Sequence, residues 1–380
     1  MRKTAARLSH KVFRPSVLGQ MLREAFERIT RPVTVRRATP ARGKGYMLEA
    51  IEPRLLLSAD LSYAASSSAH DFTLKAAAGA ISLYDSSDLS SALATKSIGG
   101  GGDVSVSIAR DDTLGAQGLN GDTLRIDLDT FNLLNSALSG HGLTIDFQGG
   151  SERVSTDHVI VDGTTGAVGY GLTIQSSSDI ATSATANITG DFTLKSEQTA
   201  SDLLDTGLWA DSNTAITLSG ANLTASGALN LTAHSDVTVS TTGTGMTAIQ
   251  GAAVTSFSGA TIDISGNSIL HGTDINLTSS VDGTLTASAA AAAVKLVAVI
   301  GAATPQITID GSSQLHATGN LTALSKSDVT INASTSPETG SSDSSIDAAV
   351  VNTTFGSGAA LSVSGGALLD ATGTASLSAS

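Results

Sequence analysis

The sequence predicts an all-β protein whose main body, residues 172–380, is a right-handed parallel β-helix, a solenoid of short stacked strands. Three observations predict this fold. Aromatic residues make up only 3% of the chain, so its core must be built in thin layers from small aliphatic side chains. Apolar and polar residues alternate over short segments that glycine-rich turns separate. One strand pattern recurs four times in the last two-fifths of the chain.

Charge and composition divide the chain into three parts: a basic leader (1–65), a β-rich module (66–171) and the repeats (172–380). Residues 1–54 contain 13 Lys and Arg against 4 Asp and Glu, and the rest contains 8 against 30, which together give the net charge of −13. The acidic part repels nucleic acid and anionic membranes, so we expect no nucleic-acid partner. The absence of cysteine suits a chain that is exported unfolded.

The leader lacks the apolar core of a secretory signal peptide in residues 1–15. Residues 16–29 predict one amphipathic helix, with Arg23, Glu27 and Arg28 off its apolar face, in an otherwise mostly disordered segment. A Pro-containing, basic stretch then predicts an extended linker up to residue 45.

A short motif follows the linker. Its residues are Glu52, Pro53, Arg54, Leu56 and Leu57, with Ile51 where leucine is usual. The segment resembles the LEPR-XLL motif found near the N-terminus of very large bacterial repeat proteins, many of them adhesins or calcium-binding exoproteins. The resemblance covers about a dozen residues and implies export of a large protein rather than an activity.

The β-rich module consists of short strands of period two. We expect them at 72–74, 81–83, 104–108, 124–128, 143–147 and 159–161. Two of its turns, 99–103 and 118–124, are similar to calcium-binding Gly/Asp nonapeptides. Calcium sites of that type need tandem copies, and these copies are single and out of register. We therefore expect ordinary turns here, with calcium as the alternative.

The repeats begin at Ile216, Ile262, Ile307 and Leu361, which lie 46, 45 and 54 residues apart. Each start is followed by a glycine four residues later and then by a second strand, and a partial copy precedes them at 188–194. Short strands of this kind bury their apolar edge only by stacking, so we expect a β-helix with roughly two coils per repeat. The final strand-like segment, 375–380, predicts that the repeats continue beyond it.

The rival fold is a string of immunoglobulin-like sandwiches, which are about 100 residues long and carry a core aromatic residue. The repeat is half that length and Trp209 is the only tryptophan, which favours the solenoid. The repeat region, residues 172–380, resembles the shaft of filamentous haemagglutinins.

Residues 287–303 are the most apolar segment, but Lys295 interrupts them and they are too short for a membrane span. We expect a buried coil or a short capping helix there.

The repeats offer little catalytic chemistry, and we expect no catalytic, cofactor-binding or metal-binding residues. His271, His316 and Asp370 share one repeat position and predict a solvent-facing polar row, with a metal ladder as the alternative. Pectin-cleaving β-helix enzymes combine acidic residues with Arg or Lys on one face. Residues 172–380 contain no Arg and three Lys, so we expect no enzyme of that kind.

These observations predict a secreted or cell-surface structural or adhesive protein that mediates attachment or biofilm-type interactions. Its partner would be a host, surface or matrix ligand that the sequence does not specify. The secretion machinery would read the leader or a C-terminal signal beyond this chain. The alternative is the stalk of a secreted toxin or effector whose active domain lies beyond residue 380.

Overall fold

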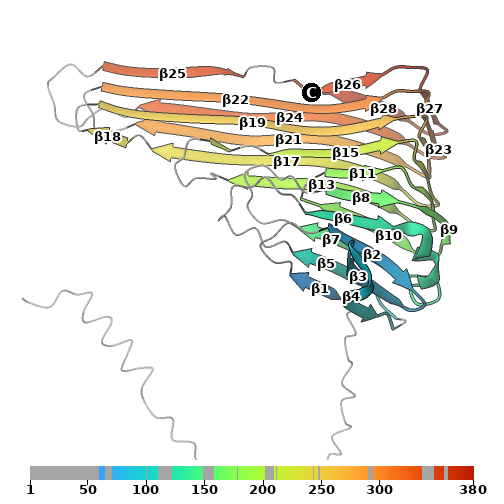
Figure 1. The fold of residues 1–380 in the computed structure, drawn as a ribbon. Helices are drawn as coiled ribbons and strands as arrows, with labels where there is room; N and C mark the ends of the chain where they lie inside the picture. The colour runs from blue at the N-terminus through green and yellow to red at the C-terminus, as the bar shows by residue number, and fades with distance from the viewer. Residues whose placement is uncertain are drawn as a thin grey trace, which may run out of the picture. The chain divides into compact units, whose positions relative to one another are not determined.

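The computed structural model describes residues 60–64, 71–99, 101–109, 122–148, 158–177, 179–201, 209–210, 212–242, 244–246, 249–289, 294–335, 346–354 and 358–380. The chain divides into two units, Met1–Leu55 and Leu56–Ser380, and all described residues belong to the second. That unit is a parallel β-helix of three stacked sheets, which confirms the predicted fold class (Figure 1). The predicted helix at 16–29 lies outside the described residues.

Three sheets, called A, B and C here, form the sides of the solenoid. Sheet A contains, in spatial order, β1 (Leu61–Ala64), β5 (Val104–Ala109), β7 (Gly142–Gln148), β10 (Gly171–Ser176), β13 (Phe192–Ser201), β17 (Leu229–Thr242), β21 (Ile275–Ala289), β24 (Leu321–Thr335) and β28 (Ala375–Ala379). Sheet C contains β9 (Thr164–Val168), β12 (Thr185–Ile188), β16 (Asn222–Ala225), β20 (Ile269–Gly272), β23 (Gln314–Ala317) and β27 (Leu368–Ala371).

Sheet B is the largest of the three. It contains β4 (Asp88–Ser97), β3 (Ala80–Asp85), β2 (Asp71–Ala77), β6 (Thr123–Asp127), β8 (His158–Asp162), β11 (Asp179–Thr182), β15 (Asn213–Ser219), β19 (Ile249–Ser265), β22 (Val294–Ile309) and β25 (Ile346–Thr354). Three short strands pair at its side: β14 (Trp209–Ala210) and β18 (Thr244–Met246) with β19, and β26 (Ala360–Val363) with β22.

Each sequence repeat forms one coil, which runs through a strand of sheet B, one of sheet C and one of sheet A. Ile216 pairs with Ile262, Ile262 with Ile307, and Ile307 with Leu361 on adjacent parallel strands. The prediction of two coils per repeat is therefore wrong. The strands of sheets A and B are much longer than expected, up to 17 residues in β19, and they take up the residues assigned to a second coil.

Almost all variation in coil length occurs at one corner, between sheet A and sheet B. The number of residues from a core position of sheet A to the next core position of sheet B varies widely. It is 8 from Leu172 to Ile180 and 33 from Leu229 to Ile262. The path from sheet B through sheet C to sheet A stays nearly constant, at 12 residues from Ile180 to Phe192 and 13 from Ile262 to Ile275. The solenoid therefore keeps its register while its coils widen.

Glycine makes the turn from sheet B to sheet C possible in the repeats. Gly220, Gly266, Gly311 and Gly365 occupy the same place and have φ between 63° and 69°, a left-handed conformation that favours glycine. A Cβ on Gly266 would lie 2.8 Å from the backbone nitrogen of Gly220 in the preceding coil. The repeated glycine therefore satisfies both the turn and the close stacking of turns.

Apolar rows, one side chain per coil and nearly all aliphatic, form the core. In sheet A the row is Leu143, Leu172, Phe192, Leu229, Ile275 and Leu321, and in sheet B it is Val159, Ile180, Ile216, Ile262 and Ile307; all are at most 1% exposed. Each such side chain contributes about 1.5–3 kcal/mol on burial. The predicted core positions Leu229, Leu231, Ile275 and Leu277 are all confirmed.

The wide coils end in a two-layered extension, where the second halves of β17, β21 and β24 cover the first halves of β19 and β22 (Figure 1). Its layers are close because small residues separate them: a Cβ on Gly301 would lie 2.7 Å from Cδ1 of Leu285. The apolar stretch 287–303 lies here, and its described parts are strand, the end of β21 and the start of β22. A capping helix is therefore not formed by those residues.

The first coils have an antiparallel addition and the one helix among the described residues. β2, β3 and β4 pair antiparallel at the end of sheet B. The 3-10 helix η1 (Leu128–Leu134) starts at Leu128, which was predicted as strand. The helix begins there because Asp127 caps it by accepting a hydrogen bond from the backbone of Asp129.

The other strands predicted in 66–171 are confirmed. β10 pairs with β7 and with β13, so the sheets continue across the predicted boundary at residue 171.

Candidate binding face

The outer face of sheet A presents a row of small polar side chains, one from each of eight consecutive strands. The row consists of Ser105, Thr144, Thr173, Thr193, Asn230, Asn276, Thr322 and Ser376. We call it the hydroxyl–amide row. Adjacent members are about 4.8 Å apart because they lie on neighbouring strands. The row therefore runs along the axis of the solenoid.

Hydrogen bonds connect the middle of this row. Asn276 Nδ2 donates to Asn230 Oδ1 at 2.9 Å, and Asn230 Nδ2 donates to Thr193 Oγ1 at 3.2 Å. Both asparagines are partly exposed, as predicted for side chains between the core positions Leu229 and Leu231 and between Ile275 and Leu277. The ladder fixes the amide groups and leaves each of them hydrogen-bonding capacity toward solvent.

A second outward row lies beside the first and borders a groove. Its members on β7, β10 and β13 are Asp146, Gln175 and Lys195, which are in register. The groove has a volume of about 270 Å³ and is lined by these three residues with Ser176, Ser177, Glu197 and Thr199. It lies at a step in the sheet, because β10 ends at Ser176 while β13 continues to Ser201.

The groove contains hydrogen-bonding groups of both kinds. Lys195 forms an ion pair with Glu197 on the same strand, so this ammonium group is neutralised locally. Asp146 and Glu197 supply acceptors, Gln175 supplies a donor and an acceptor, and Thr199 can do either. A set of donors and acceptors of this kind is chemically suited to uncharged polar groups, which both donate and accept hydrogen bonds.

Carboxylates follow farther along the same face. Asp236, Asp282 and Asp328 lie in register on β17, β21 and β24. Lys326 Nζ is 3.3 Å from Asp328 Oδ2, and Asp282 Oδ1 is buried without a hydrogen-bond partner. The electrostatic potential at this part of the face is therefore negative.

The three residues that share a repeat position lie together on sheet C. His271, His316 and Asp370 are paired on β20, β23 and β27, one coil apart rather than two. The imidazole rings of His271 and His316 stack with centroids 4.8 Å apart and planes at 13°, and His316 Nδ1 is 3.6 Å from Asp370 Oδ2. Partial burial and the neighbouring His316 lower the pKa of His271.

This arrangement is the predicted polar row. Stacked rings direct their nitrogens side by side instead of toward one point, which does not suit a shared metal ion. Among the described residues, no group of three or more His, Asp or Glu side chains has the geometry to hold a metal. The row lies on the outside of the solenoid, with His271 and Asp370 exposed and His316 half-buried.

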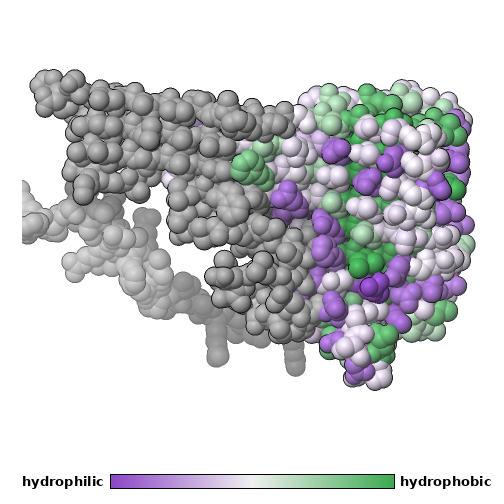
Figure 2. All heavy atoms as spheres, turned by 45° about the horizontal axis from the view of Figure 1, so that its top comes forward, coloured by the Kyte–Doolittle hydropathy of each residue, from purple (hydrophilic) through white to green (hydrophobic). Residues whose placement is uncertain are grey.

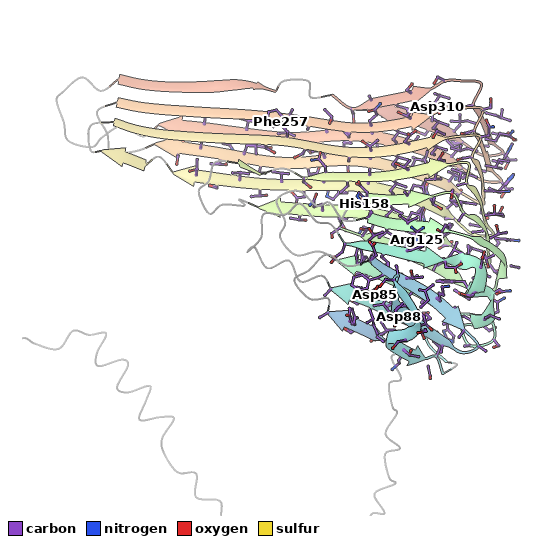
Figure 3. All side chains as sticks on the ribbon, in the orientation of Figure 1. Asp85, Asp88, Arg125, His158, Phe257 and Asp310 are labelled. Atoms are coloured by element: carbon purple, nitrogen blue, oxygen red, sulfur yellow. The ribbon has the colours of Figure 1, made fainter. Side chains whose placement is uncertain are left out.

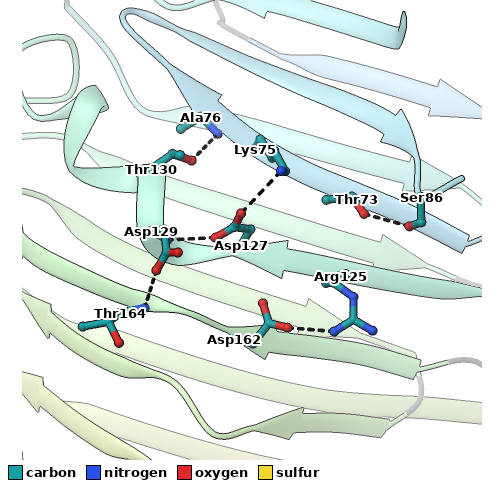
Figure 4. A network of polar contacts seen from close by, with 10 residues as sticks. All are labelled: Thr73, Lys75, Ala76, Ser86, Arg125, Asp127, Asp129, Thr130, Asp162 and Thr164. Carbon is teal, nitrogen blue, oxygen red and sulfur yellow. Dashed lines mark hydrogen bonds and ion pairs between the residues drawn. The ribbon is translucent and has the colours of Figure 1, made fainter. Parts of the chain in front are cut away.

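The charged network on sheet B joins coils to one another (Figure 4). Arg125 Nη1 donates to Asp162 Oδ2 at 2.7 Å across β6 and β8, and Lys75 Nζ is 3.6 Å from Asp127 Oδ2. Asp129 Oδ1 accepts a hydrogen bond from the backbone of Thr164 at 2.6 Å. Because each charge faces an opposite charge or a backbone donor within the protein, we assign this network a structural role.

Two further ionisable groups have shifted pKa values for structural reasons. Burial raises the pKa of Tyr170, whose hydroxyl donates to the backbone oxygen of Phe131 at 3.0 Å. Burial also raises the pKa of Asp179, and His158, 3.6 Å away, partly offsets the shift. Figure 3 shows Arg125 and His158 on neighbouring strands of sheet B.

The residues of the predicted export motif, Glu52, Pro53, Arg54, Leu56 and Leu57, lie outside the described residues. Of the two Gly/Asp turns, residues 118–121 also lie outside them. In the first turn, Asp103 Oδ1 accepts a hydrogen bond from the backbone of Gly142 at 2.8 Å, which connects β5 to β7. The Asp103 carboxylate therefore joins neighbouring coils.

Comparisons with protein-family models, with curated proteins and with solved structures find no match to this chain. In the part of the chain that the structure describes, no helix is long and apolar enough to cross a membrane. The face turned forward in Figure 2 mixes polar and weakly polar residues with small apolar groups.

The groove residues Asp146, Gln175, Lys195 and Glu197 were not predicted from the sequence. The period-two pattern marks each of them as facing outward on its own strand. It does not show that they are neighbours, because coils of 29, 20 and 37 residues separate Leu143, Leu172, Phe192 and Leu229. Only the register of strands from coils of unequal length brings them together.

Proposed function

We propose that this chain is the structural and adhesive shaft of a secreted or cell-surface bacterial repeat protein, and that it mediates attachment. The observation that carries the proposal is the hydroxyl–amide row, which continues over eight strands of sheet A. A surface that repeats the same groups at every coil is suited to repeated weak contacts, whose combined strength exceeds that of each one.

Two sequence features support an extracellular place for the shaft. The segment that resembles the LEPR-XLL motif implies export, and the absence of cysteine removes the risk of thiol oxidation outside the cell. The acidic composition after the leader keeps such a polar solenoid soluble and prevents unspecific adsorption to nucleic acid.

The proposal can be tested in the bacterium that produces the protein. Intact cells would be treated with a protease that does not enter them, and the chain would be detected with an antibody beside a cytoplasmic marker. We expect loss of the chain and survival of the marker, and we expect deletion of its gene to reduce attachment to a surface. A chain that remains protected inside intact cells would contradict the proposal.

A further inference from the structure

We propose that the outer face of sheet A binds a linear polysaccharide that carries no acidic groups. The polymer would lie along the solenoid axis on the hydroxyl–amide row, with one sugar unit in the groove beside β13. The inference rests on the proposed attachment function and names the class of ligand through which attachment occurs.

The periodicity of the face argues for a linear polymer. The hydroxyl–amide row and the row of Asp146, Gln175 and Lys195 run side by side, and both continue from coil to coil. A chain of sugar units lying along the axis meets a new pair of side chains about every 4.8 Å. A small molecule would use one coil and would leave the other coils without a role in binding.

The chemistry of the groove argues for sugar hydroxyl groups. A hydroxyl both donates and accepts hydrogen bonds, so it is served best by a wall that contains both kinds of partner. Asp146 and Glu197 accept, Gln175 does both, and Lys195 donates. Carboxylates bind neighbouring hydroxyl groups strongly because charged acceptors form the stronger hydrogen bonds.

The charge of the face argues against an acidic polymer. Residues 172–380 contain no Arg and three Lys, of which Lys195 and Lys326 each lie close to a carboxylate. Asp236, Asp282 and Asp328 add one carboxylate per coil on the same face. A uronate or sulfated chain would be repelled, whereas a neutral or amino-substituted chain would not.

The test uses the full 380-residue chain in native gels that contain a soluble neutral β-glucan, chitosan or alginate. We expect retardation by the glucan or by chitosan and none by alginate. Gln175→Trp fills the groove and should weaken binding at least about tenfold, which corresponds to the loss of one or two hydrogen bonds. Gln306→Trp places the same side chain at an exposed position of β22 in sheet B and should bind like the wild type.

Gln175→Ala keeps the proposal testable if the tryptophan variant does not fold, since it removes the amide group without adding volume. Wild-type affinity of both Gln175 variants, preference for alginate, or no retardation by any polysaccharide would overturn the inference. A chain that mediates attachment but binds none of the polysaccharides keeps the proposed function and loses this inference. A chain that binds a polysaccharide but stays inside the cell keeps this inference and loses the proposed function.

Discussion

Neighbouring residues on one strand of this solenoid have opposite environments. Ile275 is fully buried in the core, and Asn276 points outward and bonds to Asn230. Two ladders therefore run along the axis on either side of each sheet, one apolar and one polar. A substitution is harmless or severe according to which ladder it interrupts.

Replacing Ile275 by Asp should strongly destabilise the protein. The new carboxylate would be buried without a partner among aliphatic side chains, which costs several kcal/mol, and adjacent coils would lose their packing surface. Urea unfolding of the full chain, followed by circular dichroism, measures the loss. We expect a large decrease in the midpoint concentration.

The matched control is Asn276→Asp on the same strand. It replaces the amide donor to Asn230 Oδ1 by an acceptor, so we expect a loss of about 1 kcal/mol. Small and equal effects of the two substitutions would contradict the inward position of Ile275.

The stacked imidazole rings predict a pH dependence at His271. Its pKa is lowered by burial and by His316, so as the pH falls below the usual value of about 6.5 the unfolded chain takes up the proton first. Stability is therefore complete above that pH and decreases as the pH falls toward the pKa in the folded protein. The groups that face the ring are His316 and, one coil farther, Asp370.

The measurement compares wild type with His271→Gln in urea unfolding at about pH 7.5 and about pH 5.5. Carboxylates that titrate in this range affect both proteins equally. The contribution of His271 is therefore the difference between the loss of unfolding free energy in the wild type and the loss in the variant. We expect the wild type to lose more stability at the lower pH. An equal loss in both proteins would contradict the lowered pKa.

The turn from sheet B to sheet C depends on glycine. Gly266 has a φ of 66°, and a Cβ there would lie 2.8 Å from the nitrogen of Gly220. Gly266→Ala should therefore destabilise the protein by about 1–3 kcal/mol. Gly358→Ala is the control, because a Cβ at that position meets no atom within 4 Å. Equal unfolding midpoints for the two variants would show that the turn tolerates a side chain.

The strands themselves could be predicted from the sequence, but their arrangement only in part. Alternation located the core positions Leu229 and Ile275, since a strand buries every second residue regardless of what surrounds it. The number of coils per repeat could not be predicted, because strand length depends on the opposite layer. The close approach of Gly301 to Leu285 in the extension is such a tertiary effect. The groove could not be predicted for another reason: its residues become neighbours only through the register of strands from coils of unequal length.

The stability of the solenoid should not depend on calcium. Asp103 is bonded to the backbone of Gly142, and the described residues contain no cluster suited to a metal. The melting temperature should therefore change little between a chelator and millimolar calcium. A large increase with calcium would contradict this, because a ligand that binds the folded state stabilises it.

The corner between sheets A and B sets how many residues each coil contains, and therefore how long a solenoid a given number of residues forms. Every coil advances the solenoid by one strand spacing, about 4.8 Å, whether it contains 20 residues, as from Leu172 to Phe192, or 46, as from Leu229 to Ile275. Residues inserted at this corner add breadth and no length. For each residue added at this corner, the solenoid therefore gains surface area on its flanks and keeps the same rise from coil to coil.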